Sequence, residues 1–216
     1  MLVIIQARTT SRRFRNKILY TIYGKPLIQH VYEKIKKSKK VDIIISTSKN
    51  KEDDKLIKFL IYKKIRYHRG SLNNVAKRLY DTAINEKQSF FLRISGDSPL
   101  IDFRLINKII NIFEKNKNFD LITNTYPKTF PSGQSVEIIR TTALGKSLKF
   151  FSKLDKEHVT RYFYRNSKKF KIKNFINKQQ YSIKKLSIDT LNELKLILKL
   201  FNKKKFLNFS YLNEKN

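Results

Sequence analysis

The chain has 216 residues, 40% of them hydrophobic, which is enough apolar material for one substantial core. It contains no cysteine, so disulfides, thiolate zinc sites and a cysteine nucleophile are excluded, and a bound metal would be a hard cation. No apolar run approaches the length of a signal peptide or a membrane span, and we expect a cytoplasmic protein without membrane contacts.

The net charge of +31, from 48 basic and 17 acidic residues, is typical of proteins that bind nucleic acids. However, only 12 of the 48 basic residues are Arg, whereas contacts to base edges and phosphates favour Arg. The lysines are also spread along every segment of the chain. We therefore interpret them as a solvated coat that attracts polyanions at low salt, and we expect no specific nucleic-acid partner.

The first half of the chain alternates short apolar runs with amphipathic segments. Residues 1–6 predict a strand buried on both faces, and the Gly-Lys-Pro turn at 24–26 predicts the start of a helix. The same alternation continues as strand 41–46, helix 51–63, strand 65–67, helix 72–86, strand 90–95 and helix 103–116. This order predicts an α/β fold with a mainly parallel sheet and helices on both faces.

After residue 120 the pattern is less regular. A short strand at 120–123 leads into a loop rich in turn residues. The remaining predicted elements are strand 135–139, helices 141–151 and 156–166, strands 170–176 and 182–188, and helix 191–203. Because no repeat or linker interrupts the sequence, we expect residues 1–216 to form a single domain, with residues 125–188 carrying an acceptor loop or a dimer-forming flap.

A basic segment directly follows the first predicted strand: residues 8–17 contain four arginines and one lysine. In open parallel sheets, ligands bind beyond the C-terminal ends of the strands. Arginine side chains, a lysine charge and loop amides suit a triphosphate and its pyrophosphate leaving group. The alternative is a solvated basic loop. The segment lacks the glycines of a Walker loop or a dinucleotide-binding motif.

Asp97 directly follows the predicted strand 90–95, in a Gly-Asp turn. A carboxylate at this place can bind a Mg²⁺ ion that bridges nucleotide phosphates, because Mg²⁺ prefers oxygen ligands. The alternative is that Asp97 only stabilises the turn or caps a helix. Asp102 is better placed to cap the helix that begins at residue 103, so we expect Asp97 to be available for a metal ion.

Another carboxylate, Asp189, lies between the predicted strand 182–188 and the last helix. Thr190 and Glu193 form a capping-box pattern, in which their side chains satisfy the first amides of that helix. Asp189 is therefore not needed as the cap.

The opening of the chain, VIIQARTTSRRFRNKIL followed by GKPLIQHVYEKIKKSKKVD, resembles the cytidylyltransferases that make CMP-activated sugars. These include the spore coat polysaccharide biosynthesis group and the acylneuraminate and 3-deoxy-manno-octulosonate cytidylyltransferases. Their motif is close to A-R-x-x-S-x-R-x-x-x-K, and it is matched by Ala7, Arg8, Ser11, Arg13 and Lys17. The resemblance implies a three-layer Rossmann-like nucleotide-diphosphosugar transferase fold, in which these residues bind the nucleotide.

The resemblance implies roles for residues elsewhere in the chain. Asp97, in a G-D-x-P-L-I motif, and Asp189 match the metal ligands of the family, which implies a Mg²⁺ cofactor. The residues that match a segment near the nucleotide base are Arg69, Gly70, Ser71 and Arg78. Those that match motifs near the acceptor sugar are Gly133, Glu137, Glu157 and His158. For His158 a purely structural role is an equal alternative.

The resemblance therefore predicts a cytidylyltransferase, expected as a homodimer, in which a sugar hydroxyl attacks the α-phosphorus of CTP. The products would be pyrophosphate and a CMP-sugar for surface polysaccharide, the sugar being an acidic one. The catalytic residues would be Arg8, Arg13, Lys17 and Asp97.

Two alternatives remain open. The first is an inactive family member that serves as a nucleotide-binding or scaffold protein, since Arg15, Asn16, Asn74 and Ser135 replace the residues usual in the family. The second is a nucleotidyltransferase for a sugar phosphate or an alditol phosphate.

Overall fold

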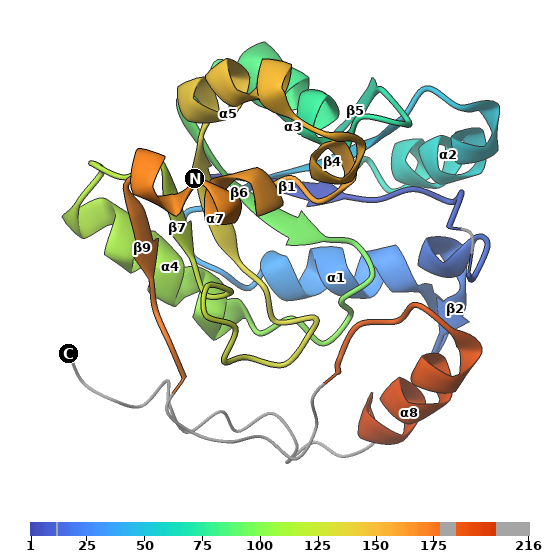
Figure 1. Ribbon diagram of the computed structural model, residues 1–216. Helices are drawn as coiled ribbons and strands as arrows, with labels where there is room; N and C mark the ends of the chain where they lie inside the picture. Colours follow the sequence, from blue (N-terminus) through green and yellow to red (C-terminus); the bar gives the residue numbers. More distant parts are fainter. Residues whose placement is uncertain (12, 178–184, 202–216) are drawn as a thin grey trace.

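The computed structural model describes residues 1–11, 13–177 and 185–201 (Figure 1). The strands of its main sheet are β1 (Leu2–Gln6), β4 (Asp42–Ser48), β5 (Tyr67–Gly70), β6 (Phe90–Ser95), β7 (Leu121–Thr123), β8 (Glu137–Arg140) and β9 (Ile172–Asn174). Their order in the sheet is β5-β4-β1-β6-β8-β7-β9. Only β8 runs antiparallel to its neighbours among these strands. This confirms the predicted α/β fold with a mainly parallel mixed sheet.

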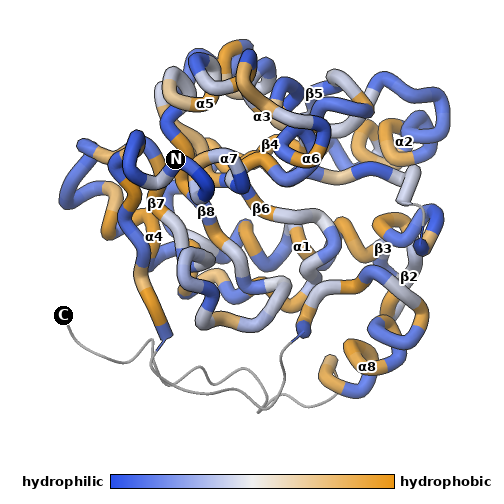
Figure 2. Tube along the Cα trace, viewed as in Figure 1, coloured by the Kyte–Doolittle hydropathy of each residue, from blue (hydrophilic) through white to orange (hydrophobic). Residues whose placement is uncertain are grey.

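Helices cover both faces of the sheet, because the strands are apolar on both sides. In β1, Val3 and Ile5 belong to one hydrophobic core, and Leu2 and Ile4 to the other. The helices of the first core are α1 (Leu27–Ile35), α2 (Asp54–Tyr62), α4 (Phe103–Lys115) and α8 (Leu191–Phe201). Those of the second are α3 (Val75–Asn85), α5 (Thr141–Ser147) and α7 (Arg161–Arg165). Figure 2 shows hydrophobic residues along the strands and helices that alternate hydrophobic with hydrophilic residues.

Strands β1 and β6 end together. Gln6, the last residue of β1, is paired with Ser46 in β4 and with Ser95 in β6. The segments that follow β1 and β6 therefore start next to each other at one edge of the sheet, where an open parallel sheet binds its ligands. In the described part of the chain, no helix is long and apolar enough to cross a membrane.

Two helices of the second half differ from the prediction. Instead of one helix over 156–166, the chain forms α6 (Lys153–Glu157) and α7, separated at His158. The cause is a capping box: Ser152 and Asp155 bond each other's backbone amides and start α6 early. The predicted helix 141–151 ends at Ser147 and continues as a 3₁₀ helix, Leu148–Phe150.

The predicted strand 182–188 is wrong for the residues that the structure describes. Residues 182–184 lie outside them, and Lys185 forms only an isolated bridge with Ser132. The first half also contains a hairpin that the sequence did not predict, β2 (Thr21–Ile22) and β3 (Lys25–Pro26). Its turn is closed by Gly24, at a φ of +76°.

Candidate active site

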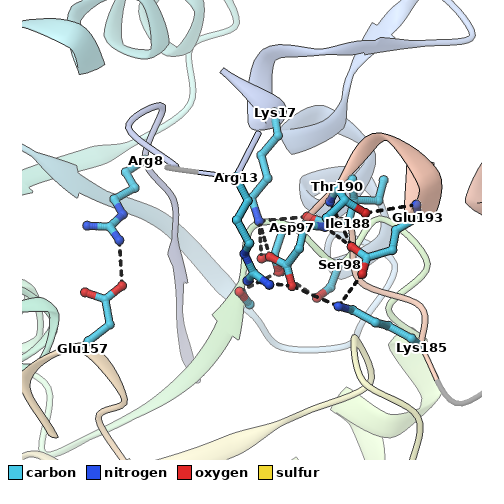
Figure 3. A network of polar contacts seen from close by, with 12 residues as sticks. Arg8, Arg13, Lys17, Asp97, Ser98, Glu157, Lys185, Ile188, Thr190 and Glu193 are labelled. Atoms are coloured by element: carbon cyan, nitrogen blue, oxygen red, sulfur yellow. Dashed lines mark hydrogen bonds and ion pairs between the residues drawn. The ribbon is translucent and has the colours of Figure 1, made fainter. Parts of the chain in front are cut away.

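Three segments that are far apart in the sequence meet beyond the ends of β1 and β6 (Figure 3). Lys17 comes from the basic segment after β1, Asp97 follows β6, and Asp189 precedes α8. The Nζ atom of Lys17 donates hydrogen bonds of 2.8 Å to Asp97 Oδ2, Asp189 Oδ1 and the carbonyl oxygen of Ile188. The two carboxylates thus converge on one position that faces the basic segment.

The Lys17 side chain is 8% exposed, so its ammonium group lies within the protein among three oxygens. Asp97 and Asp189 are 21% and 20% exposed at their side chains and face the solvent partly. Burial alone would raise the pKa of Asp189, but the hydrogen bonds and charges of Lys17, Lys185 and Arg13 hold it below its usual value. Asp189 is therefore ionised at neutral pH.

Backbone contacts fix the positions of both carboxylates. The amide of Ile188 donates to the carbonyl oxygen of Asp97 at 2.9 Å, which joins the segment before α8 to the end of β6. The amides of Asp189 and Thr190 donate to Glu193 Oε2, at 2.5 and 3.0 Å, and Glu193 is the second half of the predicted capping box. The predicted cap Asp102 also receives the amide of Arg104, at 2.8 Å. Among the residues that the structure describes, the side chains of Asp97 and Asp189 thus make no capping contact, as the sequence indicates.

A cavity of about 430 Å³ opens beside this cluster, within the size range of small-molecule sites. Its walls include most of the residues that the sequence singled out, namely Ala7, Arg8, Ser11, Arg13, Lys17, Arg78, Asp97, Glu157, His158 and Asp189. Gln6, Ile18, Val75, Arg93 and Ser95 complete the lining.

Two arginines of the basic segment line the cavity, and they lie on different sides of it. Arg13 lies 3.2 Å from Asp189 Oδ2, and its side chain is 65% exposed. Arg8 donates to Glu157 Oε1 at 2.7 Å, away from the Lys17 cluster (Figure 3). His158 is exposed on the cavity wall, between α6 and α7, rather than buried in the core.

Arg78 is the most deeply buried cation of the cavity, with 1% of the residue exposed. Its Nη1 donates to the carbonyl oxygen of Ser71 at 2.6 Å, and its Nε has no hydrogen-bond partner in the described structure. Burial, together with the charge of Arg8, lowers the pKa of Arg78 to about 10, so it remains charged at neutral pH. Gly70 makes room for it, since a Cβ there would lie 2.7 Å from Arg78 Cγ. Gly70 and Ser71 thus position Arg78 and do not line the cavity themselves.

Two further predicted residues do not line this cavity. Arg69 donates to the carbonyl oxygens of Ser48 and Asn50, at 2.9 and 3.0 Å, and so supports the connection after β4. Gly133, at a φ of +90°, packs against the chain that leads to Asp189: a Cβ there would lie 2.6 Å from the carbonyl carbon of Leu186.

Glu137 lines a second hollow of about 260 Å³, which shares Arg93 and Ser95 with the first cavity. Glu137 is 3% exposed; it forms an ion pair with Arg93 and accepts a hydrogen bond of 2.6 Å from the Tyr164 hydroxyl. Burial and the Glu137 charge raise the pKa of Tyr164, so this hydroxyl keeps its proton. Thr125, Lys128 and Ser135 complete the hollow.

The oxygen atoms around Lys17 Nζ match what a hard divalent cation requires. Two carboxylates and a carbonyl oxygen converge there, and Mg²⁺ uses one or two carboxylates together with water and substrate phosphates. Among residues 1–11, 13–177 and 185–201, no group of three or more acidic or histidine side chains is arranged to hold a metal by itself. The donor set thus fits a cation whose coordination is completed by a ligand.

A family model described as cytidylyltransferase matches residues 2–215, nearly the whole chain. The chain belongs to the cytidylyltransferase family. This confirms the resemblance seen in the basic segment and makes the protein a nucleotidyltransferase.

Known cytidylyltransferases and their relatives match it over different lengths. An uncharacterized protein of Methanocaldococcus jannaschii is 35% identical over 91% of this chain and 81% of its own. The spore coat polysaccharide biosynthesis protein SpsF of Bacillus subtilis is 25% identical over 94% of this chain and 87% of its own. The 3-deoxy-manno-octulosonate cytidylyltransferase of Fusobacterium nucleatum is 33% identical, but over 56% of this chain and 49% of its own.

Solved structures of cytidylyltransferases agree with the fold. One from Leptospira borgpetersenii superposes with a TM-score of 0.86 at 26% identity, over 94% of this chain and 87% of that one. A CMP:2-keto-3-deoxy-manno-octonic acid synthetase in complex with CTP superposes with a TM-score of 0.72 at 17% identity, over 94% and 98% of the two chains. The second likeness shows the fold alone.

The sequence pattern did not identify two contributors to the candidate site. Arg93 is a charged residue inside the otherwise apolar run of β6, a signal that could have marked it. Asp53 is completely buried and lies outside the cavity, but it receives the amide and the hydroxyl of Thr9, at 2.6 and 2.7 Å. No local pattern distinguishes Asp53 from the solvated acids next to it.

Proposed function

We propose that the protein transfers CMP from CTP to a sugar hydroxyl, releasing pyrophosphate and a CMP-sugar that is used for surface polysaccharide. The observation that carries this proposal is the convergence of Lys17, Asp97 and Asp189 beside a cavity that Arg8 and Arg13 also line. The cationic side chains of this cavity suit the phosphates of a triphosphate, and the carboxylates beside them suit its counter-cation. The family membership supports CTP as the donor.

In nucleotidyl transfer, catalysis is mostly positioning and charge neutralisation. Arg8 and Arg13 would neutralise the triphosphate and stabilise the departing pyrophosphate. Asp97 and Asp189 would hold Mg²⁺, which supplies charge neutralisation at the phosphates and helps orient the attacking hydroxyl. Arg78, with unused donors in the wall of the cavity, would bind an oxygen of the nucleotide.

We assign the acceptor sugar to the second hollow. It adjoins the first cavity across Arg93 and Ser95, which is the arrangement needed for a hydroxyl to reach a phosphate. Glu137 balances the charge of Arg93 in this hollow, so the net positive charge comes from Lys128 and favours an acidic sugar. Two of the relatives, from Fusobacterium nucleatum and Shewanella putrefaciens, are named as cytidylyltransferases for octulosonates, which are acidic sugars.

Three of the four replacements relative to the family keep the local structure, which favours an active enzyme over an inactive relative. Asn16 adopts a left-handed conformation at a φ of 56°, which asparagine tolerates better than most residues. Asn74 caps α3 by accepting the amide of Lys77 at 2.9 Å, as aspartate would. Arg15 pairs with Glu52 at the surface.

The proposal is tested by measuring pyrophosphate release with Mg²⁺, each of the four nucleoside triphosphates, and a panel of acceptors. The panel contains octulosonate, acylneuraminate, and sugar and alditol phosphates. We expect turnover with CTP and an acidic sugar. Turnover only with a phosphorylated acceptor would replace the sugar in this proposal. The absence of both turnover and CTP binding would refute it. The predicted homodimer is tested separately by sedimentation.

A further inference from the structure

Lys17 cannot donate to a phosphate while it keeps its hydrogen bonds to Asp97, Asp189 and the Ile188 carbonyl. Its ammonium group has three hydrogens, and the three hydrogen bonds to Asp97, Asp189 and the Ile188 carbonyl use all of them. In this arrangement no donor is left for a phosphate. The position between the two carboxylates is also the position that a divalent cation would occupy, so a cation and this ammonium compete for the same oxygens.

In the described structure, the other cations near the cluster do not contact both carboxylates. Arg13 and Lys185 lie 3.2 and 3.3 Å from Asp189 Oδ2, and neither contacts Asp97 in the described structure. Both have more exposed side chains than Lys17, at 65% and 37% against 8%. Charge neutralisation of the facing pair Asp97 and Asp189 therefore depends mainly on Lys17, since the ion pairs of exposed groups are weak.

We infer that Lys17 is a positioning residue that makes cation binding depend on the nucleotide. Without nucleotide, its ammonium group neutralises Asp97 and Asp189 and keeps divalent cations out. A triphosphate in the cavity offers Lys17 other anionic oxygens, and the flexible four-carbon side chain allows the ammonium group to turn toward them. The two carboxylates then become available to the cation. The inference rests on the proposed function, because it requires a triphosphate in this cavity.

Linkage gives this arrangement a measurable consequence. If nucleotide raises the affinity for the cation, the cation must raise the affinity for nucleotide by the same factor. Removing the ammonium group leaves two carboxylates facing each other without their main counter-ion. The protein should then bind the cation more tightly without nucleotide, and nucleotide should raise the affinity for the cation by a smaller factor.

The experiment measures Mn²⁺ binding to the protein by electron paramagnetic resonance of free Mn²⁺, with and without the α,β-methylene analogue of CTP, after subtracting the Mn²⁺ that the analogue binds without protein. For the wild type we expect weak Mn²⁺ binding that tightens with the analogue by about tenfold or more. For Lys17→Met we expect Mn²⁺ affinity without nucleotide to rise by about tenfold, and the effect of the analogue to shrink correspondingly. Lys17→Gln serves as a second variant if Lys17→Met folds poorly.

Two matched lysines serve as controls. Lys185→Met removes a cation that reaches only Asp189 and should have a smaller effect, whereas Lys25→Met breaks a surface pair with Glu33 and should have none. Unchanged Mn²⁺ affinity in both Lys17 variants, or no effect of the analogue on the wild type, overturns the inference. A wild type that fails to bind CTP with Mn²⁺ at all refutes the proposed function itself. If the wild type binds CTP with Mn²⁺ and the Lys17 variants show the same Mn²⁺ affinities as the wild type, only the inference is refuted.

Discussion

Thr9 and Asp53 join the loop after β1 to the loop after β4: the amide and the hydroxyl of Thr9 donate to Asp53 Oδ1 at 2.6 and 2.7 Å. The other oxygen of Asp53 accepts from the amide and hydroxyl of Ser48, so a completely buried carboxylate is satisfied by four donors and, among the residues that the structure describes, by no direct cation contact. Asp53 therefore fixes the start of the basic segment that carries Arg8, Arg13 and Lys17.

The first prediction concerns this anchor. Asp53→Ala should lower the free energy of unfolding by about 2–3 kcal/mol, because four donors lose a charged acceptor in the interior. It should also weaken CTP binding, since the loop loses its fixed course. Urea denaturation and calorimetry measure the two effects. Asp42→Ala, which breaks an exposed pair with Arg66, is the control and should change neither by much. Equal behaviour of the two variants would contradict the role given to Asp53.

The second prediction concerns the proposed cation ligands. Asp97→Asn and Asp189→Asn should each reduce kcat by about 100-fold or more, because phosphate charge would lose its neutralisation, while the circular dichroism spectrum stays unchanged. Asp120→Asn, in a partly exposed pair with Arg140, is the control of the same chemistry. Wild-type turnover in either aspartate variant would remove that residue from the site.

The third prediction concerns pH. The pKa of Asp189 is lower in the folded protein than the ordinary value of 3.8, so its ion pairs stabilise the fold fully above that value and lose their effect as the pH falls through the folded pKa. Wild type should therefore be more stable than Asp189→Asn above about pH 4, and the difference should vanish in stronger acid. Urea denaturation along a pH series measures it. A constant difference down to the most acidic pH would show that Asp189 is not held ionised by Lys17.

The fourth prediction concerns Arg78, a buried cation whose Nε has no hydrogen-bond partner among the residues that the structure describes. Arg78→Met should raise the Kd for CTP by about tenfold or more, and change the free energy of unfolding by less than about 1.5 kcal/mol, since an underpaired charge is costly to bury. Because the pKa of Arg78 is about 10, the difference in the Kd for CTP between wild type and the variant should disappear as the pH rises through that value. Lys77→Met, whose side chain pairs with Asp81, is the control on the same helix.

The fifth prediction concerns the second hollow. Tyr164→Phe removes the hydroxyl that donates to Glu137 at 2.6 Å, and should raise the KM for the acceptor by about fivefold to tenfold through a misplaced Glu137–Arg93 pair. The Kd for CTP should stay within about twofold, which separates this effect from general loosening of the structure. A parallel rise in both constants would place Tyr164 in the support of the fold rather than of the acceptor.

The sequence predicts the central sheet well, because the apolar runs of β1, β4 and β6 require burial on both faces. It also identifies the helix caps Asp102, Thr190 and Glu193, which is why Asp97 and Asp189 are not needed as caps. It does not predict that Arg93 meets Glu137. That contact depends on the antiparallel register of β6 and β8, which brings together residues 44 positions apart.

The tight packing of Gly133 against the backbone of Leu186 and Ser187 links two parts of the molecule that a designer would wish to change separately. The loop before β8 borders the hollow that we assign to the sugar, while the chain it touches leads directly to Asp189. Remodelling that loop to accept a different sugar would shift the carboxylate at the reaction centre. Exchange of acceptor loops between such enzymes should therefore succeed only when the stretch before the last helix is transplanted with them.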